Sequence, residues 1–300
     1  MRVTARSIMA MVWPALMLIP LFIHCGRRLP SVSGPTAEPS PVTQSNLKQW
    51  NAPKVPAGLF WISQCCQDNP PYTIPGGWPL ITLERLQEFS AIGANATIIR
   101  PTTWNEGWDA VTRSVSDAQS LGIWIEVDVL DVWSLRTGGG WPWVNDTCET
   151  IQSAPKEYHR RWVFDLVKAT GSFSNVLYQI GNEGGVASCA TSEDWEVGIR
   201  DAIHEAETSY GYQRHLVGTN SEQPQIEVRM DYGIYHQETA IGPGSKPRII
   251  NEYRRITPKQ YKEELEVSRK IGTGFILWRG EMTDSEWEEA KGYLKAARDK

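Results

Sequence analysis

The sequence has few phenylalanines, few cysteines and no excess of basic residues. Only 6 of its 300 residues are Phe, whereas 14 are Trp, whose flat indole faces suit sugars and interfaces. The 5 cysteines are too few for a small fold held together by disulfides. With 30 Lys and Arg against 35 Asp and Glu, the net charge of −5 argues against nucleic acid as a partner. The excess of tryptophan is a first indication of a carbohydrate-binding surface.

The motifs of nucleotide and metal binding are also missing. An open doubly wound sheet would carry a glycine-rich phosphate loop after an early strand. Ser63-Gln64-Cys65 follow the first apolar run instead, and the glycine run Thr137–Gly140 contains no lysine. No cluster of His and Cys has the spacing of metal ligands, so we expect no metal site.

Residues 1–28 are predicted to direct export and to lie outside the fold. Arg2 and Arg6 precede an apolar run from Ile8 to Ile23, which is the pattern of a secretory signal. No small-residue cleavage site follows, and the run approaches the length of a membrane span. A membrane anchor, or a lipid anchor at Cys25, is therefore the alternative. We predict an exported protein, either secreted or associated with the membrane through its N-terminus at the cell surface or in the periplasm.

Residues 29–52 are rich in Pro, Ser and Thr and lack apolar periodicity, which predicts a linker. The remaining residues, 53–300, are predicted to form one domain. Their number, 248, is close to the roughly 250 residues of a (β/α)8 barrel.

Eight short apolar runs alternate with amphipathic stretches in this domain. Most runs are rich in Ile, Val and Leu without clean alternation, as expected for parallel strands covered on both faces. The fold class is therefore α/β, as a (β/α)8 TIM barrel, with the open doubly wound sheet as the alternative. The gaps 220–231 and 237–247 are too short for full helices. The runs are Gly58–Ile62, Ala96–Arg100, Ile123–Val129, Val176–Ile180, His215–Thr219, Tyr232–His236, Arg248–Glu252 and Gly274–Trp278, and the helical stripes include Leu83, Trp162, Trp195, Tyr261 and Trp287.

Polar residues stand at the ends of several predicted strands, where a barrel carries its chemistry. Glu183 and Glu252 end the fourth and seventh runs and would face each other across the barrel. Two carboxyl groups about 5–5.5 Å apart are what retaining glycoside hydrolysis requires. The other candidate residues at strand ends are Arg100, Asn182, Tyr235, His236 and Trp278.

Two of these segments resemble a known group of enzymes. Val176–Glu183, with the sequence VLYQIGNE, resembles the fourth-strand signature of the clan A glycoside hydrolases, the cellulase-like TIM-barrel superfamily that includes family 5. Lys246–Tyr253, with the sequence KPRIINEY, is similar to the seventh-strand segment that ends in the nucleophile. The resemblance implies that Asn182 binds the sugar 2-hydroxyl, that Glu183 is the acid/base and that Glu252 is the nucleophile.

The same resemblance implies roles for the remaining strand-end residues. Arg100 would support the nucleophile, and Tyr235 or His236 would lie beside it. Trp278 would form the floor of the subsite at the cleaved bond. The chain also departs from the group, because Asp128–Asp131 stands where cellulase-like members often carry a histidine.

Each assignment has a simpler alternative. Glu183 could be a carboxylate that favours a helix N-terminus. Glu252 could pair with Arg254 or Arg255 on a surface loop. Arg100 could cap a strand, although a carboxylate nucleophile needs a cationic neighbour to stay ionised.

Tryptophans and cysteines cluster in the predicted loops. Trp133 and Trp141 are predicted to stack on sugar rings, with packing inside the loops as the alternative. Trp104, Trp108 and Trp143 belong to the same cluster. Two of the cysteines, Cys148 and Cys189, follow the neighbouring third and fourth runs and are predicted to form a disulfide. The partners of Cys65 and Cys66 stay open.

The sequence thus predicts an exported, monomeric, retaining β-glycoside hydrolase that acts on a polysaccharide or oligosaccharide. No cofactor is implied, and nucleic acid is excluded as a partner. Two alternatives remain: a barrel that binds carbohydrate without cleaving it, and a transglycosylase, which would use the same residues.

Overall fold

Eight parallel strands form the sheet in the described part of the computed structural model. The structure describes residues 60–62, 81–101, 107–136, 146–185, 189–235, 248–250, 257–271, 274–277 and 283–298. All of them belong to the compact unit Asn51–Lys300. The strands are β1 (Phe60–Ile62), β2 (Ala96–Ile99), β3 (Trp124–Leu130), β4 (Val176–Ile180), β5 (Val217–Thr219), β6 (Tyr232–Tyr235), β7 (Arg248–Ile250) and β8 (Gly274–Leu277).

These strands close into a barrel. Each pairs in parallel with the next strand along the chain, and β8 pairs with β1. Each of the eight predicted apolar runs overlaps one strand, and the bounds differ by no more than two residues. The predicted α/β architecture of parallel strands joined by helices is confirmed.

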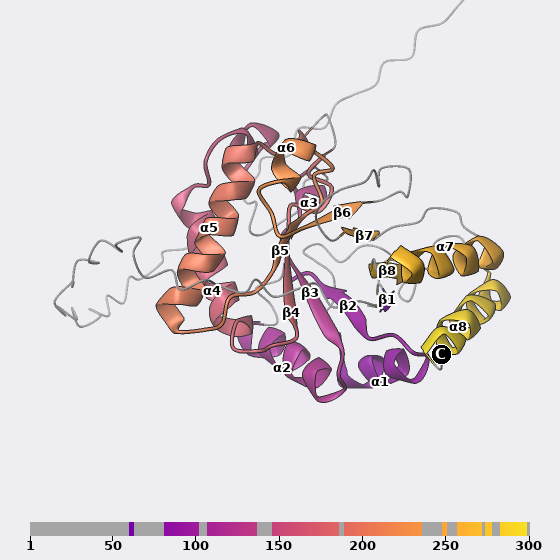
Figure 1. Cartoon of the computed structure of the whole chain (residues 1–300). Helices are drawn as coiled ribbons and strands as arrows, with labels where there is room; N and C mark the ends of the chain where they lie inside the picture. The colour runs from indigo at the N-terminus through magenta and orange to yellow at the C-terminus, as the bar shows by residue number, and fades with distance from the viewer. Residues whose placement is uncertain are drawn as a thin grey trace, which may run out of the picture. The chain divides into compact units, whose positions relative to one another are not determined.

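Helices lie around the outside of the strands, as Figure 1 shows for the magenta and orange part of the chain. Their bounds are α1 (Leu83–Ala91), α2 (Gly107–Ser120), α3 (Val132–Arg136), α4 (Glu157–Thr170), α5 (Glu193–Tyr210), α6 (Pro224–Glu227), α7 (Pro258–Ile271) and α8 (Asp284–Arg298), with a 3₁₀ helix η2 at Cys148–Gln152. The short α6 confirms that the connection over 220–231 has no room for a full helix.

Helix α2 is an addition to the predicted helices. Its buried face consists of Val111, Ser114, Val115 and Ala118. These side chains are small, and one of them is polar, so they do not stand out as an apolar stripe. No apolar stripe was predicted for the chain after β2, and the helix there shows that small residues at helical spacing suffice when a neighbouring helix covers them.

Residues at the ends of α5 show why this long helix begins and ends where it does. The Ser192 hydroxyl accepts the backbone N–H of Trp195, and acidic Glu193 and Asp194 lie in the first turn. Both features favour a helix start, through capping and through the helix dipole. Gly211 ends the helix in a left-handed conformation, with φ of 72°.

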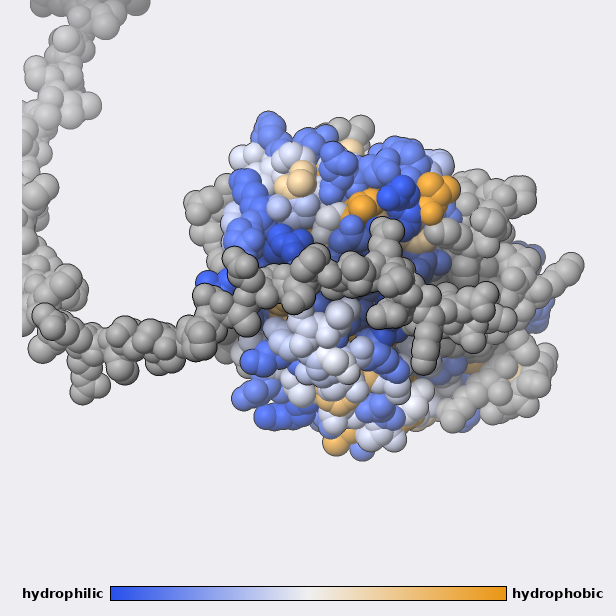
Figure 2. Space-filling model, turned by 60° about the vertical axis from the view of Figure 1, so that its left-hand side comes forward, coloured by the Kyte–Doolittle hydropathy of each residue, from blue (hydrophilic) through white to orange (hydrophobic). Residues whose placement is uncertain are grey.

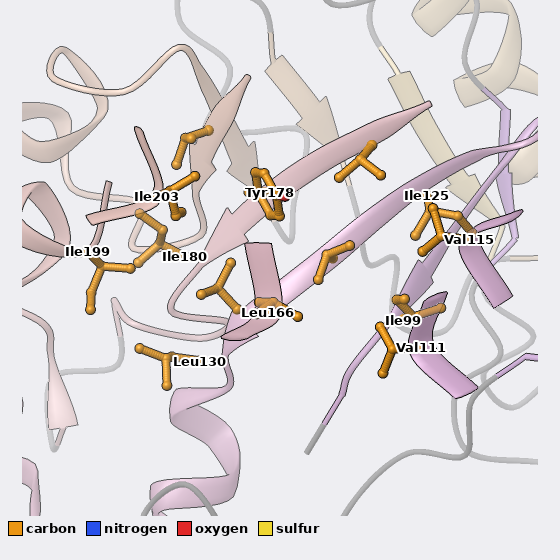
Figure 3. Packing of buried hydrophobic residues seen from close by; sticks show 14 of the residues in the cluster. Ile99, Val111, Val115, Ile125, Leu130, Leu166, Tyr178, Ile180, Ile199 and Ile203 are labelled. Atoms are coloured by element: carbon orange, nitrogen blue, oxygen red, sulfur yellow. The ribbon is translucent and has the colours of Figure 1, made fainter. Parts of the chain in front are cut away.

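The larger apolar core lies between the strands and the outer helices. Figure 3 shows Ile125 and Tyr178 of the strands packed near Val115 and Leu166 of the helices. The indole of Trp162 donates to the Val129 carbonyl at 2.9 Å, which ties α4 to β3. Trp108, expected among the sugar-stacking tryptophans, instead lies in α2 with its ring centroid 4.8 Å from that of Trp162. The alternative of packing is therefore the correct one for this residue.

A smaller cluster fills the inside of the barrel. Its buried members are Ala96, Leu177, Leu216, Tyr232 and Ile234. The Tyr232 ring lies against Gly218, where an added Cβ atom would be 2.4 Å from the ring. A glycine at this position of β5 therefore allows the tyrosine to cross the interior, which matters for the polar groups described below.

The described surface is mainly hydrophilic. Figure 2 shows apolar residues scattered singly between polar ones on the face in view. Within the described ranges, the large apolar residues that are exposed are Leu83, Tyr210 and Val228, which lie on separate segments. Such scattered residues are ordinary and do not mark a docking surface.

Some predicted features lie outside the described residues. These are the export segment 1–28, the linker 29–52, and Cys65 and Cys66. Among the described helices, none combines the length and the apolar character needed to cross a membrane.

Candidate active site

Three neighbouring strands bring charged and amide side chains to one end of the barrel. Strands β2, β3 and β4 pair in parallel, so their carboxyl ends lie together. Arg100 follows β2, and Glu183 follows β4. Between them, at the end of β3, lie two acidic residues. We call Arg100, Asp128, Asp131, Asn182 and Glu183 the strand-end cluster.

Arg100 forms an ion pair with the first of these acids. Its Nε lies 3.0 Å from Oδ2 of Asp128, whose side chain is fully buried, while the arginine side chain is 15% exposed. Burial raises the pKa of Asp128 well above its usual value, the charge of Asp131 raises it further, and Arg100 opposes the rise. Burial thus favours the protonated form of Asp128, while the contact with Arg100 favours the charged form.

A second buried acid of β3 lies inside the barrel. Tyr232 donates its hydroxyl to Oε1 of Glu126 at 3.0 Å and lies 2.9 Å from the carbonyl of Tyr178. Burial raises the pKa of Glu126 to about 8, and the hydrogen bond from Tyr232 and the charge of Arg100 only partly oppose this. The polar groups of β3 thus continue inward from the carboxyl end of the barrel.

Asn182 is held on both sides of its amide. Its Nδ2 donates to Oδ1 of Asp131 at 3.0 Å, and its Oδ1 accepts from Nε2 of Gln179 at 3.2 Å. All three side chains are buried. The residue that was predicted to bind substrate is therefore fixed in one orientation by side chains of β3 and β4.

Glu183 lies in a turn with unusual backbone geometry. Its φ is 57°, in the left-handed region that few residues other than glycine adopt. Its backbone N–H donates to Oδ1 of Asn220, at the end of β5, at 2.8 Å. Its carboxylate accepts a hydrogen bond from Nη2 of Arg136, the last residue of α3. The helix α5 begins only at Glu193, so Glu183 is not a residue of that helix's N-terminus.

Glycines allow this turn to pack closely. Gly181 has a positive φ of 65° directly before Asn182. A Cβ atom at Gly185 would lie 2.0 Å from the carbonyl oxygen of Ser221, so only glycine fits there. This close approach to the β5 end is a physical reason for the glycine at position 185.

A disulfide joins the connections that follow β3 and β4. Cys148 in η2 bonds to Cys189, and their Cα atoms are 4.9 Å apart. The predicted pairing is confirmed. The bridge holds the chain between Glu183 and α5 against the segment after α3, close in sequence to the strand-end cluster.

The structure describes only part of the predicted site. It places Arg100, Asn182 and Glu183 at the same end of the barrel, after β2 and β4, with β3 between these two strands. It places Tyr235 at the end of β6 and Trp133 in α3, without describing their side chains. The other predicted site residues, Glu252, His236, Trp278 and Trp141, lie outside the described residues.

Four residues of this region were not among the predicted site residues: Asp128, Asp131, Arg136 and Asn220. A signal for the first two was present, because an otherwise apolar buried strand with the sequence WIEVDVL carries acids at alternate positions and is followed by a further one. Burying such acids costs free energy unless they have hydrogen-bond or ion-pair partners, so a pair of them in an apolar strand indicates a functional site. Contacts of Arg136 and Asn220 depend on the path of loops, which the sequence does not indicate.

The chemistry of the cluster is that of proton transfer and of binding polar ligands. It combines three acidic side chains, the guanidinium of Arg100 and the fixed amide of Asn182 at one end of the barrel. In the part of the chain that the structure describes, no three His, Cys, Asp or Glu side chains are placed to hold a metal ion.

The similarities of this chain to known proteins are structural and distant. No family model matches the chain, and no curated protein matches it. Similar solved structures include the endo-1,4-β-mannanase of Rhizomucor miehei (11% identity, TM-score 0.49, 73% of this chain and 90% of that chain). The endo-β-1,4-mannanase of Thermotoga petrophila has 13% identity and a TM-score of 0.47 over 73% of this chain and 74% of that one. A glycoside hydrolase family 5 protein of Bacteroides vulgatus has 13% identity and a TM-score of 0.43 over 65% and 53% of the two chains.

These values are too low to transfer a substrate or a residue's role.

Proposed function

We propose that the protein is a retaining β-glycoside hydrolase in which Glu183 is the acid/base and Glu252 is the nucleophile. The observation that carries the proposal is the placement of Asn182 and Glu183 at the carboxyl end of β4, at the same end of the barrel as Arg100, which follows β2. In a barrel of this kind, catalytic groups lie at that end of the strands.

In the first step, Glu252 would attack the anomeric carbon while Glu183 donates its proton to the glycosidic oxygen. The bond from the anomeric carbon to that oxygen breaks, and a covalent glycosyl-enzyme forms. The Glu183 carboxylate that remains would be stabilised by Arg136, which contacts it directly.

In the second step, Glu183 would take a proton from water as the water attacks the anomeric carbon. The bond to Glu252 then breaks, and the sugar leaves with its original anomeric configuration. A transglycosylase would differ only in that a sugar hydroxyl replaces the water.

Arg100 is suited to keep the nucleophile ionised. Its described partner, Asp128, has a pKa that burial and the charge of Asp131 raise well above the usual value, so Asp128 neutralises the guanidinium charge less completely than an ordinary carboxylate would. A cation in this position lowers the pKa of a neighbouring carboxyl, which is what a carboxylate nucleophile such as Glu252 needs.

The substrate in this proposal is a β-linked polysaccharide or oligosaccharide. Tyr235, His236 and Trp278 would contact the sugar at the cleaved bond, and Trp133 and Trp141 would stack on neighbouring sugar rings. The proposed reaction takes place outside the cytoplasm, because residues 1–28 have the pattern of an export signal or anchor.

Two variants test the roles of the glutamates. The native protein is first assayed on a panel of β-linked polysaccharides, including mannan, cellulose, xylan and laminarin, and on the dinitrophenyl β-glycosides of their sugars. Glu252→Ala should be nearly inactive, and azide should restore turnover with an α-glycosyl azide as product. Glu183→Ala should lose activity on polysaccharides but form the intermediate from dinitrophenyl glycosides, and azide should then yield a β-glycosyl azide.

Opposite anomers from the two variants distinguish the two roles. Near-native activity of both variants on every substrate would refute the assignment. Glycan binding without cleavage by the native protein would favour the non-catalytic barrel instead.

A further inference from the structure

The amide of Asn182 is clamped between two buried partners from different strands. Asp131, at the end of β3, is 1% exposed, and Gln179, within β4, is fully buried. Asp131 accepts from Nδ2 of Asn182 at 3.0 Å, and Gln179 donates to its Oδ1 at 3.2 Å. We propose that Asp131 is a positioning residue that fixes the orientation of Asn182 and, through it, the direction of Glu183. This inference rests on the proposed function.

The chemistry of the clamp allows one amide orientation only. A carboxylate can accept hydrogen bonds but cannot donate them, so Asp131 requires the NH₂ group of Asn182. Rotation of the amide by 180° would bring two oxygens together and would place two NH₂ groups against each other at Gln179. The carboxylate of Asp131 thus determines which way the Asn182 amide is oriented.

The clamp leaves Asn182 with a free capacity to bind. Its NH₂ group has two hydrogens, and the bond to Asp131 uses one of them. A fixed donor costs no reorganisation when a sugar hydroxyl arrives, which is the advantage of a pre-oriented site.

Stability alone is a poor explanation for Asp131. Burying a carboxylate costs free energy that an apolar side chain of similar size would not cost. A second buried acid, Asp128, lies close enough for the charge of Asp131 to raise its pKa. Two neighbouring buried acids are an expensive arrangement, and the bond to Asn182 gives one of them a role in the site.

Asn182 in turn sets the position of the neighbouring glutamate. Glu183 directly follows it, with φ at 57°, and its own N–H is held by Asn220 of the β5 end. The turn is therefore fixed from both sides: by Asp131 from β3 and by Asn220 from β5. Loss of the β3 contact frees one side of this turn.

The test compares Asp131→Ala, which removes the acceptor, with Asp131→Asn, whose side-chain oxygen can still accept from Asn182. On the polysaccharide that the native protein cleaves best, Asp131→Ala should lose about 10- to 100-fold in kcat/KM, as expected for a displaced catalytic group. Most of this loss should be in kcat, and Asp131→Asn should recover most of it. The double variant with Asn182→Ala should be no worse than Asn182→Ala alone, because Asp131 acts through Asn182.

A matched control separates positioning from general loss of stability. Glu207→Gln changes another buried carboxylate, on α5, and should lower the midpoint of thermal unfolding while kcat/KM stays within about 2-fold of native. If Asp131→Ala has native kcat/KM, or if its effect adds to that of Asn182→Ala, the proposal is wrong.

A second readout does not depend on activity. In ¹⁵N-labelled full-length protein, the side-chain NH₂ signals of Asn182, assigned by their loss in Asn182→Asp, should shift and exchange faster with water in Asp131→Ala but not in Asp131→Asn. Unchanged signals in Asp131→Ala would overturn the clamp. If the native protein cleaves no glycan, the proposed function fails, and this measurement still decides whether Asp131 orients Asn182.

Discussion

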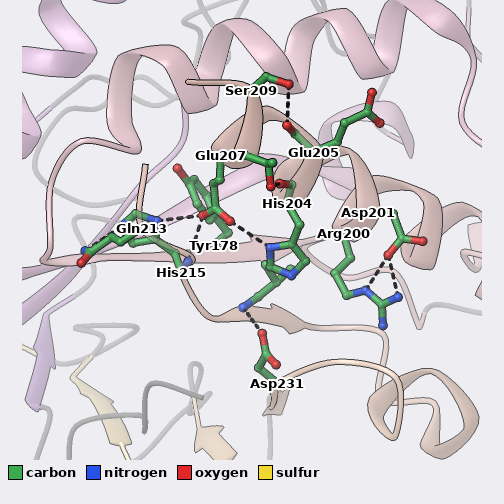
Figure 4. Close-up of polar contacts among 12 residues, drawn as sticks. Tyr178, Arg200, Asp201, His204, Glu205, Glu207, Ser209, Gln213, His215 and Asp231 are labelled. Carbon is green, nitrogen blue, oxygen red and sulfur yellow. Dashed lines mark hydrogen bonds and ion pairs between the residues drawn. The ribbon is translucent and has the colours of Figure 1, made fainter. Parts of the chain in front are cut away.

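The molecule buries carboxylates in two different ways, one on α5 and one at the strand ends. On α5, the two oxygens of Glu207 lie 2.9 Å from Nδ1 of His204 and 2.8 Å from Nδ1 of His215 (Figure 4). The backbone N–H of His215 also donates to this carboxylate at 2.9 Å. We call His204, Glu207 and His215 the α5 cluster. Burial alone would raise the pKa of Glu207, but the hydrogen bonds from the two histidines outweigh it and lower the pKa.

The strand-end cluster shows the opposite balance. Asp128 is buried near another acid, and its pKa is raised well above its usual value despite the ion pair with Arg100. Glu183 has a left-handed backbone conformation that costs of the order of 1–3 kcal/mol. The α5 cluster is thus arranged for stability, whereas the strand-end cluster tolerates repulsion and strain. Such a contrast is expected where one region serves function.

The sharpest way to test this contrast is to change one glutamate in each cluster. Glu183→Gln should lower kcat on polysaccharides by about 10²- to 10⁴-fold, because the amide cannot donate or take the proton. The free energy of unfolding, measured in urea, should change little. A variant that keeps native kcat would remove Glu183 from the proposed mechanism.

The disulfide should stabilise the region between the two clusters. Its cysteines are 41 residues apart in the sequence. A closed loop of this length corresponds to about 4 kcal/mol in the chain-entropy account, with measured values of about 2–5 kcal/mol. Replacing Cys148 and Cys189 together by Ala should lower the free energy of unfolding by that amount, and an unchanged value would show that the bridge does not form.

Glu207→Gln should have the reverse effect of Glu183→Gln. Removing the charge leaves the two histidines without their carboxylate, which should cost about 3 kcal/mol of unfolding free energy at pH 7. Because the pKa of Glu207 is lowered by folding, its contribution is present above about pH 4.5 and is lost as the pH falls below that value. The difference from the native protein should therefore shrink in acid, and a difference that grows instead would contradict the assignment.

Glu126 should make stability depend on pH in the other direction. Folding raises its pKa to about 8, so its contribution is greatest below its unfolded value near 4.5 and is lost as the pH rises towards 8. The slope for one such group is at most about 1.4 kcal/mol per pH unit. Glu126→Gln should flatten the pH dependence of urea unfolding between pH 5 and pH 8. An unaltered slope would show that this acid is ionised in the folded protein.

The smallest effect on stability is expected for Arg136. Its ion pair with Glu183 is partly exposed, with side chains 19% and 13% exposed, and such pairs contribute about 1 kcal/mol or less. Arg136→Met should therefore unfold almost as the native protein does but should lower kcat on polysaccharides, since the side chain that contacts and orients the Glu183 carboxylate is gone. A native kcat would limit Arg136 to a packing role.

Much of the fold could be predicted because the apolar runs carry it. Each predicted run overlaps a strand, and the order of strands β3 and β4 was enough to predict the bridge between Cys148 and Cys189. Helix α2 was missed because its buried face is made of small side chains. The local sequence pattern thus predicts the strands and helices that bury large apolar side chains, and misses a helix that buries small ones.

The site could be predicted only in part, for a different reason. Arg100, Asn182 and Glu183 were recognisable as polar residues at strand ends. The contacts of Asp131 and Arg136 depend on strand register and on the path of the chain after β3, and these arise from packing of the whole barrel. The left-handed φ of Glu183 had no local signal, because the residue type disfavours it.

The central claim is that the strand-end cluster belongs to a retaining glycosidase. The most direct test is ¹H NMR of the native protein acting on the β-linked polysaccharide that it cleaves best, recorded before mutarotation equilibrates the products. The account predicts that the β-anomer of the new reducing end appears first. First appearance of the α-anomer would contradict the double displacement by Glu252 and Glu183. Absence of any new reducing end would contradict the proposal that the protein is a glycoside hydrolase.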